Sequence, residues 1–366
     1  MNATKSNSIT LMQYIFLIHG AQVATVVFSL PRLVAQDAGT DGWISIILNW
    51  AFSVLAGWLF LLTLRKYPEL TLPGLAERLF GKWLGKLLLL MAIVYFAFSG
   101  WFIIINSMLY IKSWFLSRTP EYVIVLLLAI PGYMVVRQGL RVQGRYAEFV
   151  FYMTIWMLLF LLVPLRHGHW IHLLPVFKDS LQPIMNGTMN TLSSFSGIEI
   201  VFIIYPFLQK KQYALRGMFI ANTLTLFVYL FTTISCFVFF SPDGITSINQ
   251  PLLFLLKNIE FRFLERLDMV SLALYLFVVS VSWMPFVYCA VFSSSRLLNK
   301  ADHRNHAFLY FAAVVAGAYF IQPTWDQSEQ WLEWYNLIFK IVIGVIPIVL
   351  YVYVWGVEKV RKRRAG

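Results

Sequence analysis

The stretch MNTLSSFSGIE, residues 189–199, lies inside an otherwise apolar block that runs from residue 183 to residue 208. It brings hydroxyl side chains, a glycine and the carboxylate of Glu199 to the middle of the block. A block of this length can cross the roughly 30 Å hydrocarbon core of a bilayer as a helix. Polar groups at that depth are unfavourable unless they face protein or water. The stretch therefore predicts an interrupted transmembrane helix whose polar side chains face the protein interior.

The first apolar block, residues 11–36, carries a similar interruption. It contains HGAQVAT at residues 19–25 and ends with SLPR at residues 29–32. Histidine, glutamine, threonine and glycine are again unfavourable in a helix that faces lipid. The block is too long for the apolar part of a signal peptide, and no small-residue cleavage site follows it. We therefore expect a retained first span.

Similar apolar blocks recur along the 366 residues. Hydrophobic residues make up 59% of the chain and charged residues only 13%, against about 25% charged residues in soluble domains. The blocks lack the strict alternation of lipid-facing strands, and backbone polar groups in lipid must be satisfied internally, so we expect helices. The sequence predicts one all-α integral membrane domain of about ten helices, at residues 11–36, 42–64, 84–115, 121–137, 146–164, 183–208, 215–240, 268–295, 306–322 and 335–356.

The positive charges are distributed unequally between alternate loops. A net charge of +12 would make nucleic acid a candidate partner of a soluble protein, but here the Lys and Arg residues lie in short loops, where they orient helices. The side that holds Lys5, the 65–86 loop and the C-terminal tail carries 20 of them, and the opposite side, which includes Arg262 and Arg266, carries 7. Because cytoplasmic loops carry the excess, we expect both termini in the cytoplasm and no nucleic-acid partner.

The ten spans divide into five plus five, and an interrupted span opens each half. The first five spans begin inside and the second five begin outside, so two similar halves would be inverted relative to each other. Inverted repeats are a common plan of secondary transporters. We expect a first repeat over residues 1–165, a second over residues 183–356, and a basic cytoplasmic tail over residues 357–366.

Interruptions at corresponding positions of two halves point to the binding site of a transporter. Freed backbone N–H groups, with the helix dipole, can hold a carboxylate, and freed carbonyls can hold an ammonium or a cation. An amino acid carries both charges on one carbon and suits such a pair. The alternative is that the small residues only let helices pack closely. The candidate substrate-binding residues are His19, Gly20, Ala21, Gln22, Thr25, Ser193, Phe195, Ser196, Gly197 and Glu199.

Five further ionisable residues need separate interpretation. Glu199 is the one that we expect to act, as a site for a substrate ammonium, a proton or a cation; the alternative is a structural partner for a buried donor. Lys340 in the tenth span either is such a partner or snorkels to the outer interface. Arg145 and Glu148 are spaced for an i,i+3 ion pair, with an inner gate as the alternative. His19 is a ligand or proton carrier, or a hydrogen-bonded histidine of the bundle.

No pattern in the chain points to catalysis, a metal or a cofactor. It contains no HExxH motif or nucleophile constellation, and its loops are too short for a catalytic domain. His167, His169 and His172 lie close together in an outer loop, but no helix register or carboxylate partner supports a metal site. Cys236 and Cys289 have neither CxxC spacing nor a disulfide framework. We expect no enzyme activity, no cofactor and no metal.

Several segments of the chain together resemble one family. They are HGAQ at residues 19–22, FSGIE at 195–199, GLR at 139–141 and RYAE at 145–148. Within a ten-span plan, these segments look like the B subunits of GerA-type spore germinant receptors, a family of the amino acid–polyamine–organocation transporter superfamily. The resemblance covers essentially the whole chain. It implies a LeuT-like inverted-repeat fold and nutrient sensing at the spore inner membrane beside an A and a C subunit. It also implies a small germinant, such as an amino acid, bound between the first, third, sixth, eighth and tenth helices.

Two functions therefore stay open at the level of the sequence. The first is a nutrient-binding membrane subunit of a spore germinant receptor, with a small germinant, the A and C subunits and membrane lipid as its partners. The second is a free-standing transporter that couples amino-acid movement to protons or cations. A strict channel would need a filter sequence or rings of like residues, and neither is visible.

Overall fold

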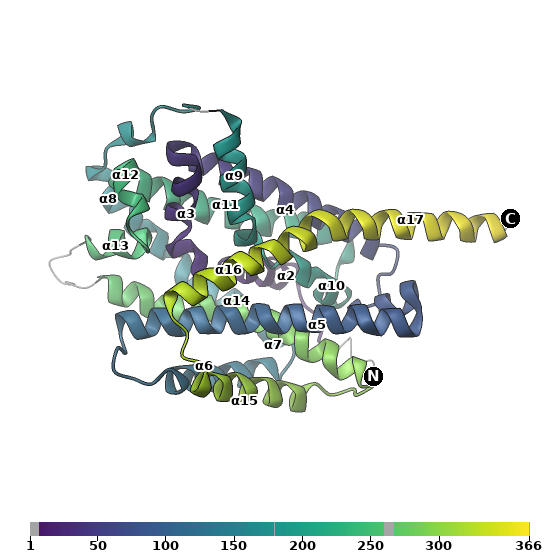
Figure 1. Cartoon of the computed structure of the whole chain (residues 1–366). Coiled ribbons are helices and arrows are strands. Elements are labelled where there is room, and N and C mark those ends of the chain that lie inside the picture. Colours follow the sequence, from purple (N-terminus) through teal and green to yellow (C-terminus); the bar gives the residue numbers. More distant parts are fainter. Residues whose placement is uncertain (1–6, 179, 260–266, 366) are drawn as a thin grey trace.

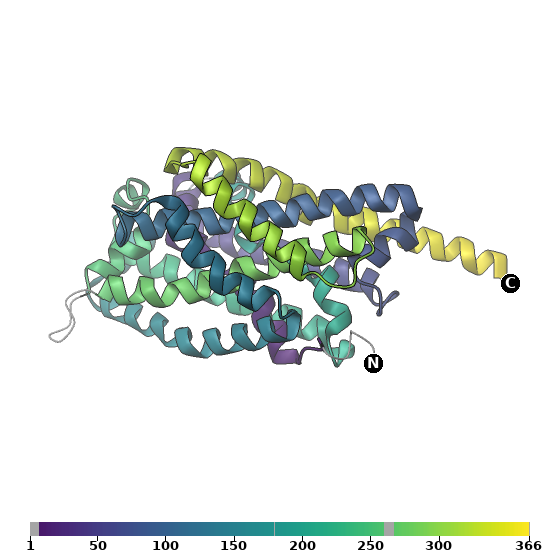
Figure 2. The same ribbon diagram turned by 90° about the horizontal axis from the view of Figure 1, so that it is seen from below.

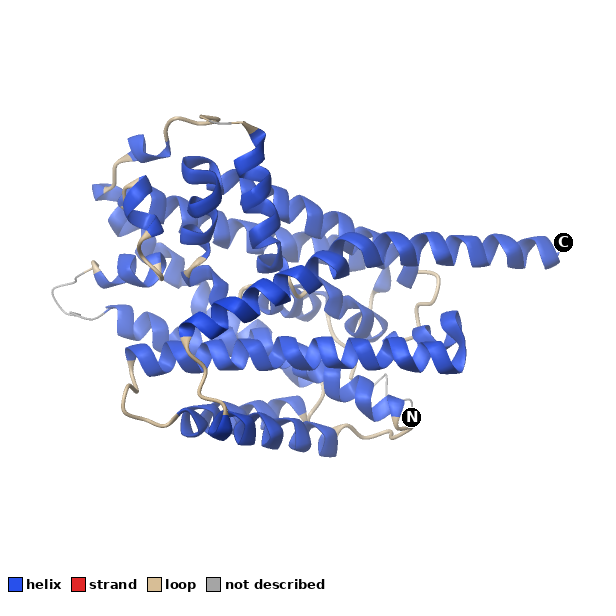
Figure 3. Cartoon of the chain, in the orientation of Figure 1, coloured by secondary structure: helices blue, strands red, loops and turns tan. Residues whose placement is uncertain are grey.

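The computed structural model of the chain describes residues 7–178, 180–259 and 267–365 (Figure 1). Lys5, Arg262 and Arg266, which enter the orientation prediction, lie outside these residues. The described chain folds into helices without a β-strand (Figure 3). Six of its helices are long and apolar enough to cross a membrane, or up to seven if the bent pair at residues 181–195 and 198–207 is one span. The first, fourth and ninth predicted spans are also helical, in shorter or broken pieces.

In the first half of the chain, helices lie at all five predicted spans, and the first of these spans is broken. The second predicted span coincides with its helix, whereas the third begins earlier than expected, and a kink at Gly81 (φ 78°) separates its amphipathic first turns from the long apolar part. The elements are α2 (Leu11–Gln22), η1 (Thr25–Phe28), α3 (Leu30–Ala38), η2 (Gly39–Asp41), α4 (Gly42–Leu64), α5 (Leu72–Trp114), α6 (Glu121–Val136), α7 (Leu140–Thr154), η3 (Ile155–Leu161) and α8 (Leu162–His167).

The second half repeats the pattern of a broken helix followed by longer ones. Its last crossing is longer than the predicted 335–356, because α16 begins at Trp325 with a capping box on Thr324 and continues through a π-helical segment into α17. After η4 (Trp170–Leu173), the elements are α9 (Leu181–Thr191), η5 (Leu192–Phe195), η6 (Ile198–Ile200), α10 (Val201–Ile204), η7 (Tyr205–Phe207), η8 (Lys211–Tyr213), α11 (Ala214–Phe239), α12 (Pro242–Thr246), α13 (Pro251–Lys257), α14 (Leu267–Leu297), α15 (Arg304–Phe320), α16 (Trp325–Lys340), η9 (Ile341–Val345) and α17 (Ile346–Ala365).

The broken helices lie at the centre of the bundle. α2 packs against α11, α14 and α7, and α3 packs against α9, so both pieces of the first span are surrounded by other helices. α14 runs along α5 on one side, and α6 and α15 pack together outside them (Figure 2). The short helices α12 and α13, which the sequence analysis did not predict, gather near α3 at one end of the bundle, and α17 projects beyond the opposite end (Figure 1).

Candidate functional site

The first span leaves helical geometry after Gln22, and residues 21–24 around this break are here named the first interruption. The carbonyls that lose their helical partners there accept hydrogen bonds from side chains of α14. Ser282 Oγ lies 2.6 Å from Gly20 O and 2.8 Å from Val23 O, and Tyr275 OH donates to Ala24 O at 2.7 Å. Freed carbonyls inside a bundle need such partners. α14 therefore holds the first interruption in its bent shape.

The sixth span breaks at residues 196–197, here named the second interruption. Ser196 is extended, and Gly197 has a φ of +124°, a conformation that side-chain-bearing residues rarely adopt. A Cβ on Gly197 would lie 2.9 Å from Ala21 Cβ, 3.0 Å from Ala21 C and 3.1 Å from Gln22 N. The predicted residues Ala21, Gln22 and Gly197 thus bring the two interruptions into direct backbone contact.

Side chains of α11 fasten the two interruptions to each other. Tyr229 OH lies 2.8 Å from Gln22 O and 2.9 Å from Ser194 O, so the hydroxyl hydrogen-bonds a carbonyl of each broken span. Gln22 Nε2 donates to Phe195 O at 3.2 Å and to Asn222 Oδ1 at 2.9 Å. All five residues are buried. The predicted residues Gln22 and Phe195 therefore have structural partners in each other and in α11.

We expect Tyr229→Phe to lower the thermal unfolding midpoint of the purified protein. The change keeps the ring but leaves two buried carbonyls without their donor, which costs about 1–3 kcal/mol. Tyr152→Phe is the matched control, because the Tyr152 side chain is exposed and has no hydrogen bond to a broken span among the described residues. An unchanged midpoint in Tyr229→Phe would show that the hydrogen bonds of Tyr229 OH to Gln22 O and Ser194 O contribute nothing to stability.

Glu199 lies directly after the second interruption and is buried to 2% exposure. Its Oε1 accepts from Tyr95 OH at 2.6 Å and from Ser196 Oγ at 3.0 Å, and its Oε2 accepts from Gly197 N at 2.9 Å. Tyr335 OH lies beside Ser196 Oγ at 2.5 Å. We name this group the Glu199 face. Within the described part of the chain, no cationic side chain pairs with Glu199.

The other predicted site residues have different surroundings. His19 Nδ1 lies 2.9 Å from Thr225 Oγ1 on α11. Gly20 is a close-packing position, because a Cβ there would lie 2.3 Å from Val281 Cγ1. Thr25 is buried at the start of η1. Ser193 N donates to Asn336 Oδ1 at 3.2 Å. The ten predicted residues therefore surround two interruptions that touch, but only Ser196, Gly197 and Glu199 belong to the Glu199 face.

Two ion pairs that the sequence analysis gave as alternatives are absent from the described chain. Arg145 and Glu148 form no ion pair in the described chain, because Arg145 is exposed while Glu148 accepts from Gln13 Nε2 on α2 at 3.4 Å. Lys340 was expected near the outer end of its span. It is instead the last residue of α16, five positions after Tyr335, because α16 begins at Trp325. It forms no ion pair with a described residue.

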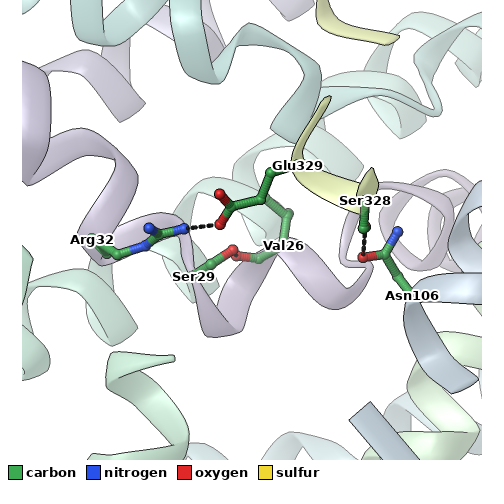
Figure 4. Close-up of polar contacts among 6 residues, drawn as sticks. All are labelled: Val26, Ser29, Arg32, Asn106, Ser328 and Glu329. Carbon is green, nitrogen blue, oxygen red and sulfur yellow. Dashed lines mark hydrogen bonds and ion pairs between the residues drawn. The ribbon is translucent and has the colours of Figure 1, made fainter. Parts of the chain in front are cut away.

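One contact that the sequence analysis missed links the first and tenth spans. Arg32 on α3 forms an ion pair with Glu329 on α16 at 2.8 Å, and Ser328 Oγ donates to Asn106 Oδ1 on α5 at 2.9 Å (Figure 4). Ser29 Oγ donates to Val26 O at 3.4 Å beside them. These bonds tie α3, α16 and α5 together at one end of the bundle. Residues separated by about 300 positions gave no sequence signal for the pair.

The family of the chain follows from comparison with known sequences. A family model described as "Spore germination protein" matches residues 8–324. The chain belongs to this spore germination protein family. Relatives include spore germination protein YndE of Bacillus subtilis, 28% identical over 81% of this chain and 82% of the relative, and spore germination protein GerQB of Bacillus cereus, 24% identical over 78% of each. Spore germination protein B2 of Bacillus subtilis is 24% identical over 98% of this chain and 97% of the relative. The predicted family is thereby confirmed.

Solved structures confirm the predicted fold class. A substrate-bound Na⁺-coupled sialic acid symporter superposes with a TM-score of 0.63 at 12% identity, over 93% of this chain and 80% of its own. MhsT in complex with L-phenylalanine gives a TM-score of 0.64 at 11% identity, over 94% and 87%. Both have the LeuT-type transporter fold, and this spore germination protein shares it. Family and fold together indicate a non-enzymatic, multi-pass membrane protein.

Proposed function

We propose that this chain is the nutrient-binding membrane subunit of a spore germinant receptor and senses a small germinant at the two interruptions. Membership of the spore germination protein family supports a role in spore germination. The transporter fold supports a mid-membrane site between broken helices. An A and a C subunit would be its partners, and the spore inner membrane its place, with both termini cytoplasmic. The repeat boundaries predicted above, 1–165 and 183–356, belong to the same proposal.

The observation that carries the proposal is the buried Glu199 carboxylate, which has hydroxyl and amide donors but no cation among the described residues. A buried carboxylate is most stable when paired with a positive charge. The ammonium group of an amino acid or another small amine supplies that charge. The two hydroxyls that contact or adjoin the carboxylate, those of Tyr95 and Tyr335, can then rearrange around the ligand.

A coupled transporter of amino acids is the second candidate, because the fold is that of symporters. The two functions predict different results in a pair of experiments. The purified protein in liposomes would be tested for amino-acid uptake driven by a proton or sodium gradient, and spores lacking the chain would be tested for nutrient-triggered germination. We expect the deletion to abolish germination with at least one nutrient. Robust coupled uptake together with normal germination would eliminate the receptor function.

The Arg32–Glu329 pair would act as a closing contact above the site. We expect Arg32→Glu to change the germinant concentration for half-maximal response about fivefold, because like charges then face each other and ion pairs near a surface contribute up to about 1 kcal/mol. The exchange Arg32→Glu with Glu329→Arg should restore the response. Lys112→Glu, which breaks a pair with Glu121 away from the interruptions, is the control. Failure of the exchange to restore the response would argue against a closing role for this pair.

A further inference from the structure

A cavity of about 100 Å³ lies beside the first interruption, away from the Glu199 face. Its walls come from the first span, from η3 and the end of α7, from α11, α13 and α14, and they include His19, Val23, Phe151, Leu253, Ser271 and Tyr275. None of the residues bonded to Glu199 lines it. The short helix α13, which forms one wall, had no counterpart in the sequence prediction. This cavity is therefore a feature separate from the proposed germinant site.

The walls are apolar except for a few hydroxyls and one imidazole. Three of those polar groups have hydrogen-bond partners in the protein. Thr154 and Thr232 donate to carbonyls of their own helices, and Tyr275 OH donates to Ala24 O. Ser271 Oγ is different, because it is buried (2% exposure) and has no hydrogen-bond partner among the described residues. A buried hydroxyl without a partner is unfavourable, and Ser271 is such a group in the cavity wall.

The hydrogen bonds of His19 leave its Nε2 without a protein partner. Gln22 Nε2 donates to Phe195 O, which can only accept, so Gln22 Oε1 is the atom that faces Thr225 Oγ1 at 2.8 Å. Thr225 Oγ1 also lies 3.1 Å from Ala221 O, but it donates to Gln22 Oε1, because two acceptor oxygens would otherwise repel across the shorter distance of 2.8 Å. The Thr225 oxygen therefore accepts from His19 Nδ1 at 2.9 Å. In the neutral ring, Nε2 is then an acceptor, and no described residue bonds it.

We propose that this cavity binds a small, neutral molecule with an apolar body and one hydrogen-bond donor, which His19 Nε2 accepts. The lining contains no Lys, Arg, Asp or Glu, so a charged ligand would have no counterion. The volume of about 100 Å³ is smaller than the cavity of about 150 Å³ that holds benzene in another protein, which limits the body to about four or five carbon atoms. Short branched alcohols have this chemistry.

Occupancy of the cavity would act on the first interruption. Val23 lies in the first interruption and Val27 in η1 directly after it, and both line the cavity. A bound molecule would fill the space into which these side chains must move if the two pieces of the span change their angle. A ligand here would stabilise the present arrangement of α2 and α3 and thereby regulate the protein. This inference stands independently of which germinant binds at the Glu199 face.

The test uses the full chain with Ser271→Cys, which places a thiol in the cavity. Methyl methanethiosulfonate, a small neutral reagent, should modify the introduced thiol about tenfold faster than that of Ser293→Cys, since thiol reactivity follows access. Ser293 is the matched control on the same helix, because its hydroxyl is also buried, has no partner in the described part of the chain and does not line the cavity. Peptide mass spectrometry distinguishes these thiols from Cys236 and Cys289.

The probe 3-methylbutan-1-ol should slow modification at position 271 by about fivefold or more, and Val278→Phe, which fills the cavity, should remove this protection. The methyl ether of the alcohol lacks the donor and should protect less. Equal modification rates at positions 271 and 293, or no protection by the alcohol, would overturn the site. Equal protection by the ether would overturn the role of His19 Nε2. The Ser271→Cys comparison decides the matter even if Val278→Phe fails to fold.

Discussion

Spores that carry Glu199→Gln in this chain should lose their response to its germinant while the protein still inserts in the membrane. In the proposed site, the carboxylate accepts from Tyr95, Ser196 and Gly197 and offers the charge for a ligand cation. Glutamine keeps the shape but removes the charge and turns an NH₂ group toward one of these donors. Hydrogen bonds to charged groups contribute about 1.5–3 kcal/mol each, which corresponds to a loss of sensitivity of about tenfold or more.

The measurement is the germinant dose–response of spores, with protein level in the spore membrane recorded by immunoblot. Glu333→Gln is the matched control, because Glu333 is an exposed glutamate on α16, the helix that carries Tyr335. Tyr95→Phe should give an intermediate response, since it removes one donor and keeps the charge. A normal dose–response in Glu199→Gln would remove the Glu199 face from consideration as the binding site.

Gly197→Ala should destabilise the protein strongly, and far more than Gly317→Ala. The φ of +124° is strained for alanine by about 1–3 kcal/mol. The new methyl group would also press on backbone atoms of Ala21 and Gln22 at 3.0 and 3.1 Å, and such overpacking costs about 1–3 kcal/mol more. Because backbone cannot move aside as a side chain can, we expect the two interruptions to separate.

The midpoint of thermal unfolding in detergent and the amount of protein in the membrane report this effect. Gly317→Ala is the control: Gly317 lies within α15, and a Cβ there would meet no atom within 4 Å. Alanine in an open helix position is neutral or stabilising by about 0.5–1 kcal/mol. If both variants unfold at the wild-type temperature, contact between the two interruptions is not important for stability.

Much of the fold could be predicted from the sequence because a bilayer imposes simple rules on length and polarity. The second span was predicted to its residue limits, and the breaks after Gln22 and at Gly197 follow from polar and small residues within apolar blocks. Span ends were less accurate. α5 begins twelve residues before the predicted start and α16 ten residues before it, because amphipathic turns continue these helices beyond the apolar core.

The tertiary partners of the site could not be predicted in the same way. Tyr95 and Tyr335 looked like ordinary aromatic residues of apolar spans, and only the packing of α5 and α16 brings them to Glu199 and Ser196. Tyr229, whose hydroxyl hydrogen-bonds both broken spans, was also not predicted. Arg145 and Glu148 have the i,i+3 spacing of an ion pair, but Glu148 instead accepts a hydrogen bond from Gln13 on another helix. Such choices depend on the assembled bundle.

The most direct test is equilibrium binding of the radiolabelled nutrient whose germination response is lost when this chain is deleted. Purified wild-type protein should bind it saturably at one site per chain, and unlabelled nutrient should compete. Glu199→Gln should weaken this binding by about tenfold or more, and Glu333→Gln should leave it unchanged. Equal binding by wild-type protein and Glu199→Gln, or no saturable binding at all, would contradict a germinant site at the two interruptions.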